Sequence, residues 1–488
     1  MKLPSVAPLE PPSTIPPTMA YISYHAAQRP ADTAIILRSS EITYQTFYHD
    51  IGRMVAAMRD LKLTSRHVVG VEAPTSYLHL LIVLACETMA VPTVSYRFGE
   101  TERIKNELVN FDLVMCMPGH EPPNSRKTHV MDEAWYASVM AGTPELYREE
   151  MRIGSDTPVR ITKSSGTTGR IKWMIHSGRF YRSMLDSYQY RAGFNRHSCG
   201  LLTMGLNLQS FFWFTAACLR AGGKIVVPGS VPVTEALSRY AVSHVLFLPK
   251  HLEEVVNNLP SDYANAANLT VLTISGPVSK TVRRRVRQKL ADNLIVGYGT
   301  SEVGVIGTVG DDGTGTVSPG MRLEVIDDND QPAFGEPGRF RVKSPASIGT
   351  YINQPEASRS MFREGWFYPG DIGIMTDSCT FELLGRTDDM FNVGGIKFLP
   401  HDLEEKLAEE LPVKDVCLTE LANDDGSKQL VVVVVPDRAR ETSDLEGQIT
   451  TLVPDLYGKT KTVIVDEIPR TDNGKLRRRE LSNTLSQL

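Results

Sequence analysis

The chain has 488 residues, which at roughly 150 residues per domain predicts two to four structural units. Hydrophobic residues make up 41% and charged residues 22%, an ordinary globular composition that excludes wholesale disorder, a collagen-like repeat and a coiled-coil rod. With 52 Lys and Arg against 57 Asp and Glu, the net charge is −5, so no overall positive field would attract nucleic acid or anionic lipid, and any phosphate binding must be local.

The chain begins with a proline-rich segment, residues 1–20, that we expect to be an extended lead-in. It lacks the apolar core of a secretory signal. The most apolar window, 77–94, is interrupted by Glu87 and Pro92 before it reaches the ~20 residues of a membrane span. The six cysteines form no C-x-x-C pair, which disfavours a zinc site and a disulfide framework. These features predict a soluble, cytoplasmic protein.

Between residues 32 and 297, short apolar runs alternate with stretches of helical periodicity, the pattern of crossover units around parallel sheets. Two blocks are predicted. The first has strands at 33–37, 68–72, 91–96 and 112–116, with helices at 44–60, 76–89 and 100–109. The second has strands at 159–162, 224–227, 244–248, 270–274 and 293–297.

Beyond residue 304 the pattern changes twice. Short alternating strands with Gly, Pro and Asp turns run to residue 384 and predict an antiparallel sheet or barrel. After a boundary that we place at Thr387–Asp388, a small α+β unit is expected. It has helices at 400–410 and 443–453 and strands at 413–421, 429–435 and 461–465. The run LVVVVV (430–435) should be a central strand, because it would promote aggregation if exposed.

The loop KSSGTTGRIK (163–172) follows a predicted strand and combines small residues, hydroxyls and a terminal lysine. Small residues let backbone N–H groups approach an anion, and Lys172 adds charge, so the loop suits a polyphosphate. It is not a Walker A loop, because its lysine neither directly follows the glycine nor precedes a Ser or Thr. Taken alone, such a loop is more often a surface turn, so its function depends on the motifs that accompany it.

Five further segments accompany this loop: SGP (275–277), YGTSE (298–302), GWFYPGD (365–371), GRTDDMFNVGGIKFLP (385–400) and PRTDNGKLRRREL (469–481). In order and spacing they resemble the motifs of adenylate-forming enzymes, the family of acyl-CoA synthetases, nonribosomal peptide synthetase adenylation domains and firefly luciferase. The resemblance implies an α/β fold. A large N-terminal domain, 21–387, would hold two parallel-type αβ sheets and a β-barrel-like subdomain, and a small mobile α+β domain, 388–488, would follow it.

The same resemblance implies ATP and Mg²⁺ as cofactors and assigns roles to individual residues. The nucleotide would contact Ser164, Ser165, Gly166, Thr167, Thr168, Gly169, Lys172, Ser275, Gly276, Pro277, Tyr298, Gly299, Asp371 and Arg386. Among these, Tyr298 would face the adenine and Asp371 would accept the ribose hydroxyls. Glu302 and Thr167 would hold Mg²⁺, Thr300 would donate to the α-phosphate, and Lys475 would be the catalytic lysine of adenylation.

A hinge is implied at Asp388, about which the small domain would rotate between two half-reactions. In one pose Lys475 completes the site. In the other, residues 391–398 replace it, and Gly394 and Gly395 leave room for a pantetheine arm to reach the acyl-adenylate.

The chain departs from the family pattern at several positions. Ile171 stands where proline is usual and Trp173 where glycine is usual. The segment 204–214 corresponds to the acid pocket but lacks both the histidine common in acyl-CoA synthetases and the aspartate that holds an amino group, which disfavours an α-amino acid substrate. Asn207, Phe211 and Phe212 are predicted pocket residues, although most of this aromatic run should be core, since consecutive residues cover all faces of a helix.

These features predict an acid–thiol ligase that forms an acyl-AMP from an aryl or medium-sized apolar acid and passes the acyl group to CoA. An enzyme that loads an acyl carrier protein, or that forms an amide, stays open, because CoA and carrier proteins end in the same arm. A catalytically silent adenylate-binding protein is disfavoured by the joint presence of Lys475, Glu302 and Asp371. The basic stretch 280–289 is expected to be a solvated helix face rather than a patch for the phosphates of CoA.

Overall fold

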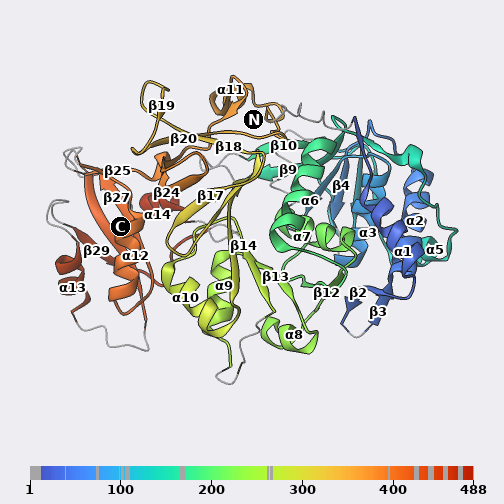
Figure 1. Cartoon of the computed structure of the whole chain (residues 1–488), viewed down its shortest axis with the longest axis horizontal. Helices are drawn as coiled ribbons and strands as arrows, with labels where there is room; N and C mark the ends of the chain where they lie inside the picture. The colour runs from blue at the N-terminus through green and yellow to red at the C-terminus, as the bar shows by residue number, and fades with distance from the viewer. Residues whose placement is uncertain are drawn as a thin grey trace, which may run out of the picture.

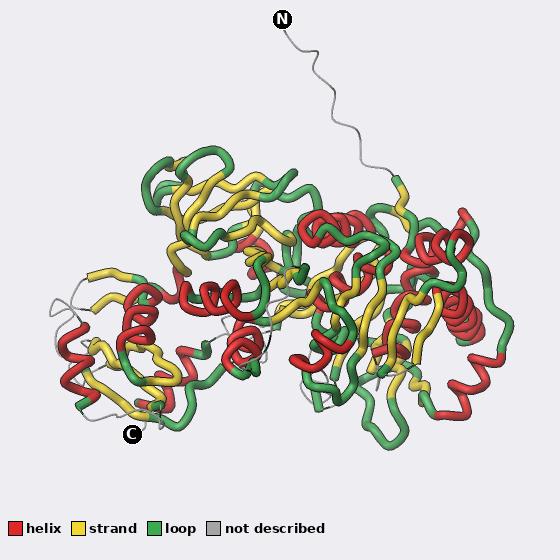
Figure 2. Tube along the Cα trace, turned by 60° about the horizontal axis from the view of Figure 1, so that its bottom comes forward, coloured by secondary structure: helices red, strands yellow, loops and turns green. Residues whose placement is uncertain are grey.

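The computed structural model describes residues 13–486 except 39, 73–75, 98, 101–103, 105–109, 165–170, 261–262, 264–267, 394–395, 423–427, 438–443, 454–459 and 471–475. It has a large part that contains two sheets and a smaller part after residue 389 (Figure 1). The predicted α/β fold class is confirmed. Figure 2 shows helices on both sides of the strands at the right of the large part, whereas the strands at its upper left are bordered mainly by loops. No described helix is both long and apolar enough to cross a bilayer.

The smaller sheet of the large part has the order β10-β9-β5-β4-β6-β7. Its strands are β4 (Val69–Glu72), β5 (Thr93–Tyr96), β6 (Leu113–Cys116), β7 (Thr128–Val130), β9 (Pro158–Ser164) and β10 (Lys172–Ser177). All neighbours are parallel except β9 and β10, which form an antiparallel pair. A short pair of β1 (Thr14–Ile15) and β8 (Ile153–Gly154) lies apart from this sheet.

The larger sheet begins as a parallel sheet. Its parallel strands are β2 (Thr33–Leu37), β11 (Cys199–Leu201), β12 (Lys224–Val227), β13 (His244–Phe247), β14 (Thr270–Thr273) and β15 (Asn293–Thr300), and β3 (Ser40–Thr43) adds an antiparallel edge. The expected antiparallel strands continue it from β15. They are β16 (Gly304–Val309), β17 (Thr314–Val317), β18 (Arg322–Ile326), β19 (Pro332–Ala333), β20 (Gly338–Lys343), β21 (Phe362–Arg363), β22 (Trp366–Phe367), β23 (Asp371–Met375) and β24 (Thr380–Arg386).

Two predicted strands lie in a different sheet from the other strands of their predicted block. The strand at 33–37 pairs with β12 of the larger sheet, and the strand at 159–162 becomes β9 of the smaller one. Both strands are short and apolar, and such a run is compatible with any buried parallel sheet. The local pattern therefore predicts the strand but not the sheet that it joins.

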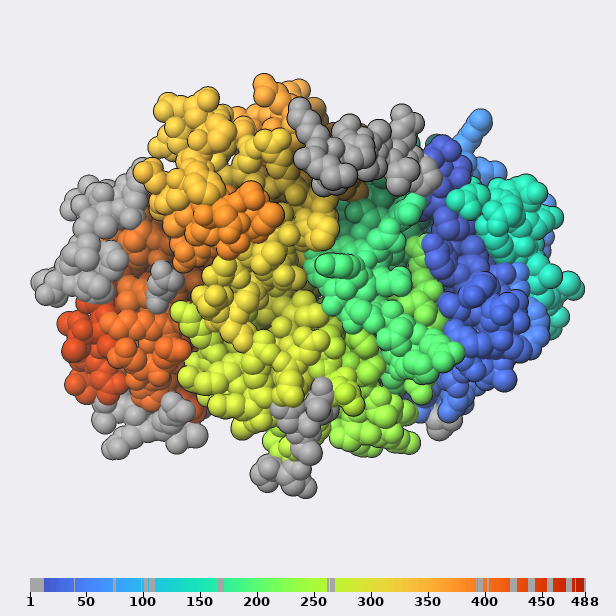
Figure 3. Space-filling model, viewed as in Figure 1, coloured from blue at the N-terminus to red at the C-terminus, as the bar shows by residue number. Residues whose placement is uncertain are grey.

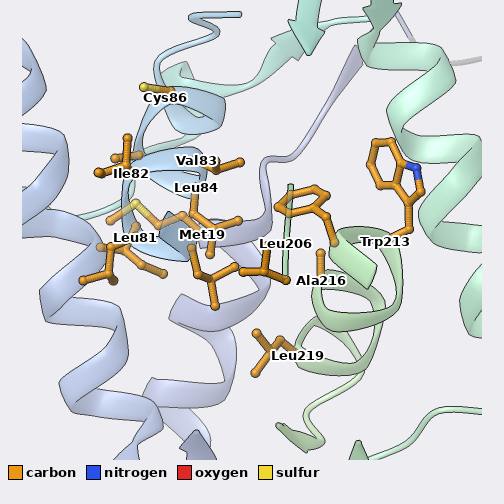
Figure 4. Close-up of a cluster of buried hydrophobic side chains, with 14 of the residues drawn as sticks. Met19, Leu81, Ile82, Val83, Leu84, Cys86, Leu206, Trp213, Ala216 and Leu219 are labelled. Carbon is orange, nitrogen blue, oxygen red and sulfur yellow. The ribbon is translucent and has the colours of Figure 1, made fainter. Parts of the chain in front are cut away.

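The helices of the large part are α1 (Thr18–Gln28), α2 (Tyr44–Asp60), α3 (Ser76–Thr88), α5 (Glu133–Ala141), α6 (Gly178–Ala192), α7 (Gln209–Arg220), α8 (Val233–Arg239), α9 (Pro249–Asn257), α10 (Lys280–Lys289) and α11 (Pro355–Met361). Helix α1 begins within the predicted lead-in. Helix α3 is buried nearly all round, as its largely apolar sequence requires, and its buried His79 and Glu87 are hydrogen-bonded to Ser95 and Thr18. Helix α1 contacts α2, α3 and α7. Figure 4 shows the resulting core, with Met19 and Leu81–Leu84 on one side and Leu206, Ala216 and Leu219 on the other.

The smaller part contains β25 (Phe391–Val393), β26 (Ile396–Phe398), α12 (His401–Glu410), β27 (Val413–Ala422), β28 (Lys428–Pro436), α13 (Leu445–Leu452), β29 (Lys461–Ile464) and α14 (Arg478–Leu485). Strand β28 lies between β27 and β29, and its residues 430–434 are buried, so the expected central position of this apolar run is confirmed.

The two parts meet where α10 contacts α12 (Figure 3). The backbone N–H of Lys280 donates to Glu405 at 3.0 Å, and the Thr281 hydroxyl donates to Glu409 at 2.9 Å. Most basic residues of α10 are exposed or half-buried, as expected for a solvated face, but Arg283 is buried and donates to the carbonyl oxygens of Val278, Val309 and Gly310.

A bidentate ion pair fixes α14 within the smaller part. The Arg478 guanidinium contacts Glu404 at 2.5 and 2.8 Å, and both side chains are largely buried. Burial alone would lower the pKa of Arg478, but hydrogen bonding to Glu404 and its charge outweigh burial and raise it. Breaking a buried pair leaves one charge uncompensated, at a cost of about 3–5 kcal/mol.

We therefore expect Glu404→Ala to destabilise the smaller part by about 3–5 kcal/mol, measured by hydrogen exchange of the α14 amides. The matched control is Glu480→Ala, which removes the partner of Arg477 in an exposed pair on the same helix and should cost less than about 1 kcal/mol. Equal effects of the two substitutions would contradict the assignment.

Candidate functional site

The predicted site residues gather where parallel strands of the larger sheet end. The carboxyl ends of β13, β14 and β15 are neighbours, and Pro249, residues 275–277 and residues 298–302 lie at or just beyond them. Open parallel sheets bind ligands at this edge. Ser275 has a φ of +82°, and a Cβ added to Gly276 would lie 3.4 Å from Pro249 Cγ, so the backbone here makes a tight turn under Pro249.

Tyr298, Asp371 and Arg386 form a hydrogen-bonded group. The Tyr298 hydroxyl donates to Asp371 Oδ2 at 2.5 Å, and Arg386 Nη1 lies 3.4 Å from Asp371 Oδ1. Asp371 begins β23 and Arg386 ends β24, where the two residues pair directly across the strands. Burial and the adjacent Asp371 carboxylate raise the pKa of Tyr298, which stays a neutral donor. The group thus presents one buried carboxylate held between a phenol and a guanidinium.

A second group joins Glu302 to the strands that flank the predicted phosphate loop. Tyr351, which is buried, donates to Glu302 Oε1 at 3.0 Å, and Lys172 Nζ lies 5.1 Å from the centre of the Tyr351 ring. Burial and the Glu302 charge raise the pKa of Tyr351. Tyr351 therefore contacts the Glu302 carboxylate with its hydroxyl and the Lys172 ammonium with its ring. No sequence motif indicated this role.

The predicted phosphate loop joins β9 to β10. Ser164 ends β9 and pairs with Lys172 at the start of β10, so these two residues lie at the base of the loop. Ile171 and Trp173, which depart from the family pattern, are both buried in one hydrophobic cluster. The Ile171 carbonyl also accepts a hydrogen bond from Gln354 at 2.6 Å. Predicted residues that lie outside the described part are Ser165, Gly166, Thr167, Thr168, Gly169, Gly394, Gly395 and Lys475.

An apolar pocket lies beside these groups. Its lining residues are Tyr188, Arg191, Leu246, Leu272, Thr273, Ile274, Ile295, Gly297 and Val305, and its empty volume is about 300 Å³, part of it open to solvent. They come from α6 and from β13 to β16, and Gly297 and Ile274 directly precede Tyr298 and Ser275. Phe211 and Phe212 are fully buried in the core, as was expected of most of the aromatic run, and neither they nor Asn207 line this pocket. Their role in binding the acid stays a prediction.

A protein-family model described as AMP-binding enzyme matches residues 22–352. The chain belongs to the AMP-binding enzyme family. This confirms the family that the motifs predicted.

Relatives of this AMP-binding enzyme differ in their named reactions. A long-chain-fatty-acid–CoA ligase of Yersinia pestis is 26% identical over 445 residues, which cover 86% of this chain and 77% of the relative. The solved structure of the anthranilate CoA ligase AuaEII with anthranoyl-AMP superposes with a TM-score of 0.83 at 17% identity, covering 98% of this chain and 99% of that one. The amide bond synthetase McbA from Marinactinospora thermotolerans gives 0.80 at 18% identity, covering 96% and 100%. These superpositions establish the shared fold.

Proposed function

We propose that this AMP-binding enzyme joins a small carboxylic acid to a thiol, using ATP to form an acyl-AMP and pyrophosphate before CoA displaces AMP. The observation that carries the proposal is the convergence of the Asp371 group and the Glu302 group on the strand edge beside an apolar pocket. We further propose residues 21–387 and 388–488 as the two domains, with a hinge at Asp388 in the 3-10 turn Thr387–Asp389. The six free thiols suit the reducing cytoplasm.

The residues fit ATP. Asp371 can accept both hydroxyls of a ribose, and the buried Thr300 Oγ1 and Arg386 Nε have no hydrogen-bond partner in the described part of the chain. Buried polar atoms are rarely left unpaired, so ribose or phosphate oxygens would complete them. Lys172 would lie near the β- and γ-phosphates from the base of its loop.

The residues also fit one Mg²⁺ bound mainly by the nucleotide. Among the described residues, no cluster of three or more His, Cys, Asp or Glu side chains could hold a metal. Glu302 and Thr167 would be the two protein ligands. Phosphate oxygens and waters would complete the shell, as is usual for Mg²⁺. The ion would neutralise charge on the phosphates during displacement of pyrophosphate.

The lining of the pocket supports an acid with an apolar body. Its walls are mostly aliphatic, and such walls suit the hydrocarbon part of an aryl or medium-sized apolar acid.

Acid-dependent exchange of pyrophosphate into ATP tests the proposal, with a panel of aryl, short-chain and long-chain acids. We expect exchange with a small acid, followed by thioester formation when CoA is added. Exchange with no acid, in folded protein that binds ATP, would overturn the enzymatic function. Exchange without thioester formation would instead favour a carrier protein or an amine as the acceptor.

Tyr351→Phe tests the Glu302 group. The substitution removes the hydrogen bond to Glu302, and such bonds to charged groups contribute about 1.5–3 kcal/mol. We expect the Mg²⁺ concentration for half-maximal exchange to rise ~10-fold or more. The control is Tyr190→Phe, because the Tyr190 side chain is 73% exposed and should leave this value unchanged. A Tyr351→Phe enzyme with an unaltered Mg²⁺ dependence would remove Tyr351 from the site.

A further inference from the structure

The apolar pocket contains three polar side chains that the proposed reaction does not use. Arg191 lies in the last turn of α6, Tyr188 lies one turn earlier, and Thr273 ends β14. The remaining lining residues are apolar, apart from the backbone of Gly297. A few polar side chains in the wall of an apolar pocket commonly orient a ligand.

Two of these side chains end in buried hydroxyls. Tyr188 is 4% exposed and Thr273 is 2% exposed. The Thr273 hydroxyl has no hydrogen-bond partner within the described residues, and the Tyr188 hydroxyl lies near the Ser210 hydroxyl. Burial raises the pKa of Tyr188 to about 12, against a smaller lowering by the hydrogen bond with Ser210, so the phenol stays neutral. Both hydroxyls can donate to a ligand, and an unpaired buried group such as that of Thr273 is uncommon in folded proteins.

The guanidinium of Arg191 is held in place without a carboxylate. Its hydrogen bonds, within the described part, go to neutral oxygens only: the Ser187 carbonyl and hydroxyl, the Val305 carbonyl at 3.3 Å and the Ser318 hydroxyl. Burial lowers the pKa of Arg191, and the opposing influences come from the phenols of Tyr188 and Tyr190 rather than from an acid. A half-buried cation of this kind is stabilised by an anion, and a carboxylate could replace these neutral oxygens as the acceptor of the guanidinium N–H groups.

We propose that the acid activated here carries a second carboxylate, which Arg191 binds with help from Tyr188 and Thr273. The inference rests on the proposed function and adds the substrate class to it. Arg191 is then a residue that determines specificity, whereas the reacting carboxylate lies at the nucleotide side of the pocket, beyond Gly297. The apolar walls would contact the short chain or ring that joins the two carboxylates.

Matched pairs of acids that differ only in the second carboxylate test this assignment. Benzoate is compared with phthalate, isophthalate and terephthalate, and hexanoate with adipate, each by kcat/KM for pyrophosphate exchange. We expect the wild-type enzyme to prefer a dicarboxylate at least ~10-fold in one of the pairs, because binding sites built around a polar group discriminate strongly against its absence.

Arg191→Met keeps the length of the side chain and removes the charge. It should lower kcat/KM for the dicarboxylate at least ~10-fold and leave the monocarboxylate within ~3-fold, and Arg191→Lys should restore part of the preference. The matched control is Arg182→Met, which removes an exposed arginine of the same helix. Thr273→Val, which keeps the shape of the side chain, should also reduce the preference for the dicarboxylate. It provides the test if Arg191→Met fails to fold.

The outcomes separate the two proposals. Exchange with no acid overturns the proposed function and this inference with it. Exchange with monocarboxylates, without preference for any dicarboxylate, overturns the inference alone. An equal loss on both members of a pair in Arg191→Met would mean that Arg191 binds the reacting carboxylate instead, which also overturns it.

Discussion

Replacing Asp371 with alanine should raise the KM for ATP at least ~10²-fold. Asp371 is a buried carboxylate that we propose as the acceptor of both ribose hydroxyls, and each hydrogen bond to a charged group contributes about 1.5–3 kcal/mol. The substitution also leaves the Tyr298 hydroxyl and the Arg386 guanidinium without their shared acceptor. The KM is measured by pyrophosphate exchange at saturating acid, and thermal melting reports any loss of stability separately.

The choice of nucleotide makes this prediction specific to the ribose. The wild-type enzyme should use ATP at least ~10-fold better than 2′-deoxy-ATP, and Asp371→Ala should reduce that ratio below ~3, because the lost hydroxyl and the lost carboxylate are partners. Asp328→Ala makes the same change of charge at an exposed position of the same subdomain and should alter neither value. If Asp371→Ala kept full discrimination against the deoxynucleotide, the carboxylate would not contact the 2′-hydroxyl.

Local elements of the fold could be predicted because each depends on neighbouring residues. The helix expected at 44–60 is α2 with the same bounds, and the strand expected at 429–435 is the central strand β28. The assignment of strands to sheets could not be predicted in the same way. It depends on which apolar strands meet across long crossovers, and β2 and β9 have no residue pattern that distinguishes one buried parallel sheet from the other.

The site shows the same division. The residues that we propose for the nucleotide lie in compact motifs, and Asp371 and Arg386, predicted separately, pair across β23 and β24. The pocket that we propose for the acid is assembled from five elements, so no single segment contains its signal. Arg191 in particular lies in the last turn of a helix, where a basic residue is favourable for the helix dipole alone. An aromatic run such as Phe211–Phe212 attracts attention in a sequence, yet it is buried in the core.

Lys475→Ala should lower the rate of acyl-AMP formation about 10²–10³-fold, the loss typical when one group that stabilises a transition state is removed. The same variant, supplied with acyl-AMP and CoA, should form the thioester within ~3-fold of the wild-type rate. The reason is our proposal, based on the resemblance to the family lysine, that Lys475 would face the α-phosphate in only one of two poses of the smaller domain.

The residues around this position show how the structure can support such a role. Arg470 pairs with Leu476 across a β-bridge, and its guanidinium makes a two-point contact with Asp415, with distances of 2.8 and 2.9 Å from Nη2. Burial raises the pKa of Glu253 in α9, and the charges of Asp415 and Arg470 also act on it, so the base of the segment that carries Lys475 lies close to the large part.

Separate measurement of the two half-reactions decides whether Lys475 acts in this way. Adenylation is followed by pyrophosphate exchange, and thiolysis by thioester formation from synthetic acyl-AMP. Lys461→Ala removes an exposed lysine on β29 of the same domain and should change neither rate more than ~2-fold, since surface substitutions away from special features have small effects. A parallel loss of both half-reactions in Lys475→Ala would contradict a lysine that serves one pose. It would instead indicate that the side chain maintains the structure of the smaller domain or contacts the adenylate throughout the reaction.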